Sequence, residues 1–257
     1  MRALAVQSAM NPDPHPSDLT AKPGGWTELA LTLPIFLVYQ LGVVFLNVRN
    51  ATDLVTSRLL ELSNGDRLTY LELTSGAGLA LMFVFGFLGR RQSFKASKML
   101  QIALEGAAYA IAMGSATSWV VGKMFAGVPA RLVDGPFTGV VMALGAGFYE
   151  ELAFRVLFFG LGAKLLVWLF VRQRVGLVGD GQRLGVGAIV IMIGWALASA
   201  AVFSGMHYLG PLGDRFDARS FVARAVLGLA LTLVYASRGF AAAVWTHALY
   251  DVWVLVM

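Results

Sequence analysis

Long apolar runs alternate with short polar stretches along the whole chain. A helix needs about 20 apolar residues to cross the hydrocarbon core of a bilayer, and several runs reach that length. We therefore predict an all-α fold, a polytopic transmembrane helix bundle with about seven spans. The predicted spans cover residues 27–48, 70–89, 101–121, 137–171, 186–207, 220–237 and 240–257.

The fourth run, 137–171, is too long for one span perpendicular to the membrane. At about 1.5 Å per residue it would reach about 50 Å, against a hydrocarbon core of about 30 Å. We expect this helix to tilt, bend or project beyond the membrane. Glycines at 145, 147, 160 and 162 are places where it could do so.

Polar and apolar residues are mixed between the first two runs, over residues 49–69. Thr52 and Asp53 are a favourable helix start, and the sequence from Ser63 to Asp66 is typical of a turn. We predict a short interfacial helix here, lying on the membrane surface.

The N-terminal segment, 1–26, contains closely spaced prolines, and its opening apolar stretch is too short for a signal peptide. We predict a mobile N-terminal tail here. The remainder, 27–257, is expected to form a single transmembrane domain whose motif-bearing core is 137–257.

Composition supports a membrane protein, because 58% of the residues are hydrophobic and only 14% are charged. Soluble domains average about 25% charged residues. The net charge is +5, and the basic residues lie in short loops between the apolar runs. Basic residues in such loops are placed to interact with the headgroups of the lipid bilayer rather than with nucleic acid. The absence of cysteine excludes disulfides and thiol catalysis. We expect a multi-pass integral membrane protein, and abundant Ala, Gly and Arg favour a bacterial inner membrane.

Three charged residues interrupt the fourth apolar run. A charge in mid-membrane costs at least about 2.5 kcal/mol. We therefore expect Glu150, Glu151 and Arg155 to be paired or to have a function. Glu151 and Arg155 are four residues apart and can form a structural ion pair on one helix face. Glu150 is rotated from Glu151 by about 100°, so it cannot be paired in the same way.

The two histidines outside the tail lie in other apolar runs. His207 follows Phe203 at the end of the fifth run, and His247 precedes Asp251 by four residues in the seventh. The span count brings all these groups to the side opposite the N-terminus. We therefore expect them to meet in one wet cavity. A small excess of Lys and Arg on the N-terminal side favours a cytoplasmic N-terminus.

These strings resemble the signatures EExxxR, FxxxH and HxxxN of the CPBP family of intramembrane proteases, which includes CAAX prenyl endopeptidases and bacteriocin-processing, Abi-like proteins. The resemblance implies a metal-free, glutamate-dependent endopeptidase without a cofactor. It implies that Glu150 activates water with His207 and that His247 stabilises the oxyanion. Glu151, Arg155 and Phe203 would be structural support.

The last signature position departs from the family pattern, because Asp251 stands where Asn is frequent. A carboxylate cannot donate a hydrogen bond unless it is protonated. Asp251 either orients His247 or stays neutral in the apolar site.

Other interpretations use the same buried groups. A zinc protease would use His207, His247 and a carboxylate as ligands, although the sequence has no HExxH string. A proton-linked transporter or a non-enzymatic scaffold are further alternatives. For a protease, the partner is a membrane-associated protein or peptide: a prenylated tail, a bacteriocin leader or a sorting segment. We favour removal of a bacterial sorting or maturation segment.

Overall fold

The computed structural model describes residues 25–46, 53–88, 96–124, 135–173, 184–209 and 213–256. Within these ranges every regular element is a helix, so the predicted all-α class is confirmed. The predicted tail, 1–26, lies outside the described residues except for Gly25 and Trp26, which begin the first described helix.

The described helices follow the predicted apolar runs closely. They are α2 (Gly25–Leu46), α3 (Leu54–Leu62), α4 (Arg67–Leu88), α5 (Ala96–Met124), α6 (Pro136–Gly145), η2 (Ala146–Glu150), η3 (Leu152–Leu161), α7 (Gly162–Val171), α8 (Val186–Met206), α9 (Ala218–Arg238) and α10 (Phe240–Val256). Each predicted run contains a helix, because a long apolar run has no other way to satisfy its backbone polar groups in lipid.

Four of the described helices are long and apolar enough to cross a membrane by length and composition. They are Thr27–Leu46, Pro136–Val171, Val186–Met206 and Ala218–Arg238. Helix α10 is a shorter apolar helix. The chain is therefore a multi-pass integral membrane protein, and the full count of about seven spans stays a prediction. Large side chains exposed on α8, such as Val190 and Ile193, suit contact with lipid.

The short helix predicted between the first two spans is α3. The Asp53 carboxylate caps it by accepting from the Thr56 backbone N–H at 2.8 Å. The predicted turn follows, with Asn64 and Gly65 at positive φ. The existence and start of this helix are confirmed, and its position at the membrane surface stays a prediction.

The long fourth run is one helical segment from Pro136 to Val171, and its middle part is π-helical. The π-helical elements η2 and η3 flank Glu151. Such π-helical turns are rare in proteins as a whole, and those that occur often lie at functional sites. Gly147 in η2 lets α10 come close, since an added Cβ there would lie 2.7 Å from the Ala248 Cβ.

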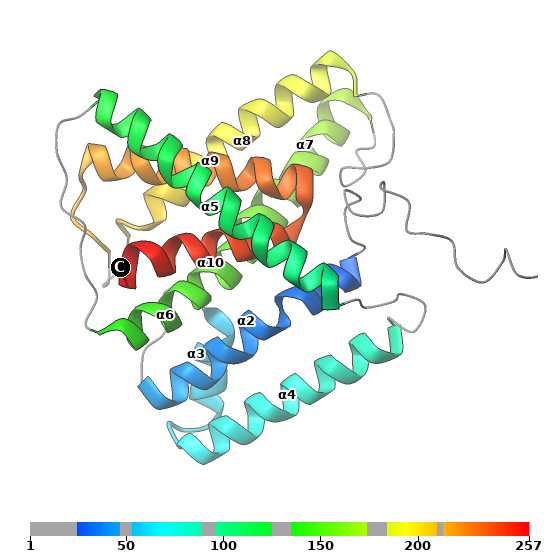
Figure 1. Ribbon diagram of the computed structural model, residues 1–257. Helices are drawn as coiled ribbons and strands as arrows, with labels where there is room; N and C mark the ends of the chain where they lie inside the picture. Colours follow the sequence, from blue (N-terminus) through cyan, green and yellow to red (C-terminus); the bar gives the residue numbers. More distant parts are fainter. Residues whose placement is uncertain are drawn as a thin grey trace, which may run out of the picture.

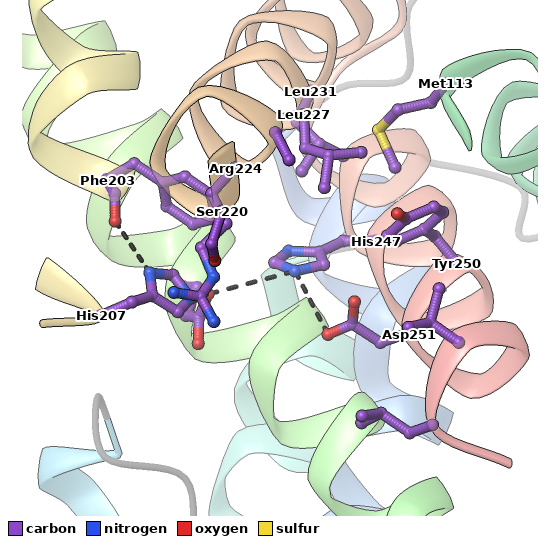
Figure 2. A pocket seen from close by; sticks show the side chains of 14 residues that line it. Met113, Phe203, His207, Ser220, Arg224, Leu227, Leu231, His247, Tyr250 and Asp251 are labelled. Atoms are coloured by element: carbon purple, nitrogen blue, oxygen red, sulfur yellow. Dashed lines mark hydrogen bonds and ion pairs between the residues drawn. The ribbon is translucent and has the colours of Figure 1, made fainter. Parts of the chain in front are cut away.

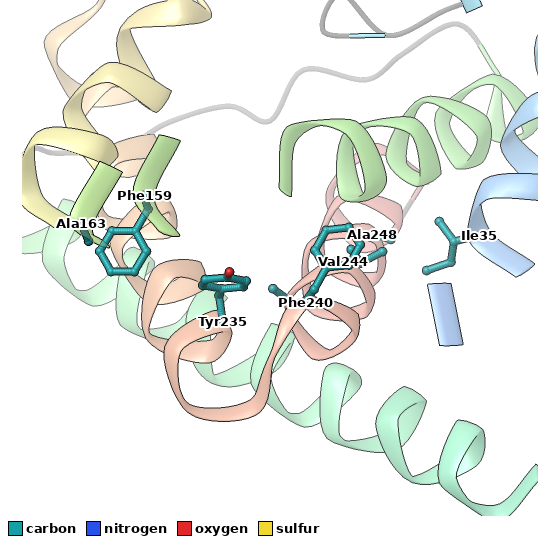
Figure 3. Close-up of a cluster of buried hydrophobic side chains, with 8 residues drawn as sticks. Ile35, Phe159, Ala163, Tyr235, Phe240, Val244 and Ala248 are labelled. Atoms are coloured by element: carbon teal, nitrogen blue, oxygen red, sulfur yellow. The ribbon is translucent and has the colours of Figure 1, made fainter. Parts of the chain in front are cut away.

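Helix α10 is the centre of the bundle. It packs against α2, α5, α6, η2, η3 and α9, and Figure 1 shows it between α5 and α6. Its residues 241–244 are fully buried. A hydrophobic cluster anchors it through Phe240, Val244 and Ala248, which pack with Ile35 of α2 and Tyr235 of α9 (Figure 3).

The beginning of α10 lies beside the beginning of α2. The Glu28 carboxylate of α2 accepts a hydrogen bond from the Ala241 backbone N–H, next to Gly239 at a φ of 102°. The second half of α10 therefore lies toward the other end of the bundle. The end of α8 and the beginning of α9 line the same cavity as this half of α10.

Candidate active site

A cavity of about 340 Å³ lies between η2, the end of α8, the first two thirds of α9, the second half of α10 and the middle of α5. Its lining residues are Met113, Glu150, Phe203, His207, Ser220, Ala223, Arg224, Leu227, Leu231, His247, Tyr250, Asp251, Val254 and Leu255. All three sequence strings contribute side chains to this one cavity (Figure 2).

Glu150 lies between the two histidines. Its Oε2 is 4.0 Å from His207 Nε2 and 4.0 Å from His247 Nε2, and the residue is only 7% exposed. These separations are too long for direct hydrogen bonds but suit a bridging water. A water at about 2.8 Å from each of two atoms 4.0 Å apart would have an angle of about 90° between its contacts, which is acceptable for water.

His207 occupies the C-cap of α8, where a side chain can reach both protein and water. Its Nδ1 is 3.0 Å from the Phe203 carbonyl oxygen, one turn earlier in the helix. A carbonyl only accepts, so Nδ1 carries the proton. In the neutral ring, Nε2 is then an acceptor directed at the side of Glu150. The side chain is 30% exposed, so solvent reaches it.

His247 is held through its other nitrogen. Its Nδ1 lies 2.8 Å from Glu151 Oε1 and therefore donates to that carboxylate, while Nε2 lies 3.4 Å from Asp251 Oδ2. The contact that orients the ring at hydrogen-bond distance thus comes from Glu151. Asp251 also lines the cavity, and its Oδ2 and the Glu150 Oε2 both approach His247 Nε2.

Glu151 and Arg155 form the predicted ion pair, with Arg155 Nε 3.1 Å from Glu151 Oε2. Both residues are fully buried. The Arg155 guanidinium also lies over the Phe203 ring, 4.5 Å from its centroid, and Phe203 packs edge-on against His207. The ion pair is therefore in contact with both histidine-bearing helices, because Glu151 also binds His247.

A buried polar network reaches the helix that carries Glu150 from the N-terminal helices. Gln40 of α2 donates to the Tyr149 hydroxyl at 2.6 Å and accepts from Tyr70 at 2.7 Å and from Thr56 at 3.3 Å. Tyr149 directly precedes Glu150. Sequence reasoning missed this network, because each member lies singly in an apolar run and only the packing brings them together.

Sequence reasoning also missed the α9 wall of the cavity. Arg224 lies within the sixth predicted run, and a charge in an apolar run is the same signal that singled out Glu150. Ser220 and Tyr250 carried no such signal.

Among the residues that the structure describes, no group of three His, Cys, Asp or Glu side chains has the arrangement needed to hold a metal ion. His207 and His247 direct their Nε2 atoms at the same Glu150 oxygen from 4.0 Å each.

The fold and the cavity define a membrane-embedded protein with carboxylates and imidazoles around a shared pocket. Residues 132–253 match the family model described as type II CAAX prenyl endopeptidase Rce1-like. This match covers the part of the chain that carries the three sequence strings and supports their resemblance to the CAAX-type intramembrane proteases of the CPBP family. No curated protein and no solved structure matched the chain.

Proposed function

We propose that this protein hydrolyses a peptide bond of a membrane-associated protein substrate, using a water molecule held by Glu150 and His207. The observation that carries this proposal is the position of one Glu150 oxygen, 4.0 Å from the Nε2 atoms of both His207 and His247 on the cavity wall.

Water activation follows from the hydrogen-bonding character of the two groups. The Glu150 carboxylate and the unprotonated Nε2 of His207 are both acceptors, and a water has two protons to donate. A water bound in this way directs an oxygen lone pair into the cavity. Glu150 takes one proton as the water oxygen bonds to the substrate carbonyl carbon.

The tetrahedral intermediate carries negative charge on the former carbonyl oxygen. His247 Nε2 is placed to donate to that oxyanion, but only in the doubly protonated ring, because Nδ1–H is already held by Glu151. The carboxylates of Glu151 and Asp251 supply the balancing negative charge. The C–N bond then breaks, and Glu150 returns its proton to the leaving amine.

Metal ions are not required by this mechanism, since water activation and oxyanion stabilisation are both assigned to side chains. Asp251 lies beside the oxyanion position and stands where the family often has Asn. We propose that it keeps the Nε2–H of His247 aligned toward the cavity, at the observed 3.4 Å.

The substrate segment must be extended to react. The carbonyls of a helix are already hydrogen-bonded, so a helical substrate would have to unwind first. We propose that residues 27–257 act as one domain of about seven spans in a bacterial inner membrane. With a cytoplasmic N-terminus the cavity opens to the outer side, which favours a sorting or maturation segment of an exported protein.

The decisive experiment compares the termini of membrane proteins in cells that express the wild type or Glu150→Gln at equal levels. Removing the base should abolish processing of at least one terminus, with a loss of at least about 10²-fold in rate. Strong zinc chelators should leave that processing by the purified protein unchanged. Identical termini in both strains would refute the proteolytic function, and chelator-dependent loss would favour the zinc alternative.

A further inference from the structure

Tyr39 of α2 lies along η2, the π-helical element that ends at Glu150. Its ring packs against Gly145, where η2 begins, so closely that an added Cβ there would overlap it. The same ring meets Tyr149 edge-on, with the two centroids 5.6 Å apart. Tyr39 is fully buried. One aromatic side chain therefore contacts both ends of the element that carries Glu150.

A buried carboxylate outside the cavity holds the Tyr39 hydroxyl. This hydroxyl donates to Asp53 Oδ2 at 2.7 Å. Asp53 is only 1% exposed, and its other oxygen caps α3 by accepting from the Thr56 backbone N–H at 2.8 Å. The carboxylate also lies close enough to Tyr149 for the two groups to interact electrostatically. Asp53 thus connects the beginning of α3 to both tyrosines at η2.

Capping a helix does not by itself explain why this carboxylate is buried. Asp66 precedes α4 and accepts from the Thr69 backbone N–H at 2.8 Å, and it is exposed. Burial of a carboxylate is costly unless the protein supplies hydrogen bonds in place of water. Asp53 is buried where Tyr39 supplies such a bond, so its position relative to α2 is part of the fold.

The π-helical form of η2 requires support from its surroundings, because π-helical turns are rare and the α-helix is the usual form of a helical chain. The rotation per residue differs between the two forms. A change of η2 to the α-helical form would therefore turn Glu150 relative to the rest of the bundle. Glu150 lies 4.0 Å from Nε2 of both His207 and His247, and such a rotation would change both distances.

Resting on the proposed function, we propose that Tyr39 and Asp53 are positioning residues for Glu150. Tyr39 holds η2 in the π-helical form that directs Glu150 at the two histidines, and Asp53 holds Tyr39 through its hydroxyl. Neither side chain is among those that line the cavity, so both act through η2 and not on the substrate. The activity of the site then depends on the beginning of α3 being in place.

The test measures amide hydrogen exchange of the full-length protein in detergent by mass spectrometry. Asp53→Ser keeps a good helix cap, but its single oxygen is used by that cap and Tyr39 loses its partner. Tyr39→Phe keeps the ring and loses the hydroxyl, and it is the milder variant should Asp53→Ser fail to fold. In each variant we expect the amides of residues 146–151 to exchange about fivefold faster than in the wild type, the equivalent of about 1 kcal/mol for one hydrogen bond.

Three comparisons separate this effect from a general loss of stability. The amides of α7, which belongs to the same long helical segment, should change much less than those of residues 146–151. Asp66→Ser makes the same substitution at an exposed cap and should leave residues 146–151 unchanged. Asp53→Asn can cap α3 with its oxygen and donate to Tyr39 with its NH₂ group, so it should restore most of the protection.

Processing of the termini that depend on Glu150 is the second readout. Asp53→Ser and Tyr39→Phe should each slow this processing by about tenfold or more at equal protein levels, since small displacements of a reacting group cost large factors in rate. Asp66→Ser should not. Unchanged exchange of residues 146–151 in both variants would overturn the proposal, and so would equal acceleration in α7. Faster exchange together with wild-type processing would show that the pair stabilises η2 without positioning Glu150.

Failure of the proposed function gives a different result, because hydrogen exchange needs no turnover. It appears as termini that do not depend on Glu150, while the difference in exchange between Asp53→Ser and Asp66→Ser persists. Failure of this inference appears as equal exchange in these two variants while Glu150-dependent processing remains.

Discussion

The two ring nitrogens of His247 have different surroundings: Nδ1 is hydrogen-bonded to Glu151, and Nε2 lies on the side of Glu150. Glu151 holds Nδ1 at 2.8 Å, and Glu151 is itself held by Arg155 at 3.1 Å. A carboxylate in this position fixes the tautomer and the orientation of the ring. The glutamate assigned to a structural ion pair thus also links that pair to the proposed oxyanion donor.

Replacing Glu151 by Gln should therefore affect stability and activity separately. The variant leaves the buried Arg155 charge unpaired, which costs about 3–5 kcal/mol in unfolding free energy. It should also lower kcat by at least about 10²-fold, as expected when a carboxylate that orients a catalytic histidine is lost. Thermal unfolding and peptide cleavage measure the two effects.

The double variant Glu151→Gln with Arg155→Gln is the matched control. It removes both charges, so much of the stability should return, while the activity should stay low because His247 is still unheld. Recovery of both properties together would mean that Glu151 acts only through the ion pair.

Substitutions of Asp251 test the surroundings of the other ring nitrogen of His247, Nε2. Asp251→Asn places an amide donor beside the oxyanion position, as in the frequent family sequence, so we expect kcat to stay within about threefold of the wild type or to rise. Asp251→Leu, which has no polar atom, should be at least about tenfold slower. Steady-state kinetics at constant pH measure both. An Asn variant as inactive as Glu150→Gln would show that the site needs the negative charge.

At the scale of the elements, the wide π-helical turns present Glu150 to the cavity and Glu151 to His247. The predicted rotation of about 100° between consecutive residues already separated these two side chains. A residue distant in sequence supports this turn. Gln40 of α2 donates a hydrogen bond to the hydroxyl of Tyr149, the residue before Glu150, at 2.6 Å.

Gln40→Leu should weaken this support. It removes the partner of the Tyr149 hydroxyl and of the Tyr70 hydroxyl, and each buried polar group left unsatisfied costs about 1–3 kcal/mol. We expect a clear drop in the unfolding temperature and in kcat. Gln101→Leu is the matched control: Gln101 donates to Glu105 at 2.6 Å in a part-buried position, so its loss should cost less. Equal drops in the two variants would contradict the special role of Gln40.

At the scale of the whole molecule, the N-terminal helices belong to the same packed unit as the part of the chain that matches the family model. Helix α2 packs on α4, α6 and α10, although the family match begins only at residue 132. Glu28 caps the beginning of the central helix, and the Gln40 network supports the turn that carries Glu150. These contacts support our proposal of one domain over residues 27–257.

The absence of cysteine allows a direct test of topology. Ala218 and Ser237 are exposed near the two ends of α9, so single cysteines there should react with a membrane-impermeant maleimide from opposite sides. With the predicted cytoplasmic N-terminus, Ala218→Cys should label in intact cells and Ser237→Cys only after permeabilisation. Labelling of both from one side would show that α9 does not span the membrane.

The amino-acid sequence alone determined the helical class, the positions of the apolar helices to within a few residues, and four polar residues of the cavity: Glu150, His207, His247 and Asp251. These properties are local, because apolar length and mid-membrane charge are visible along a single run. Only the tertiary structure decided that Glu151 holds His247, that Gln40 supports Tyr149 and that Arg224 lines the pocket. Each of these contacts joins helices distant in sequence, and helix packing rather than spacing along the chain sets which side chains meet.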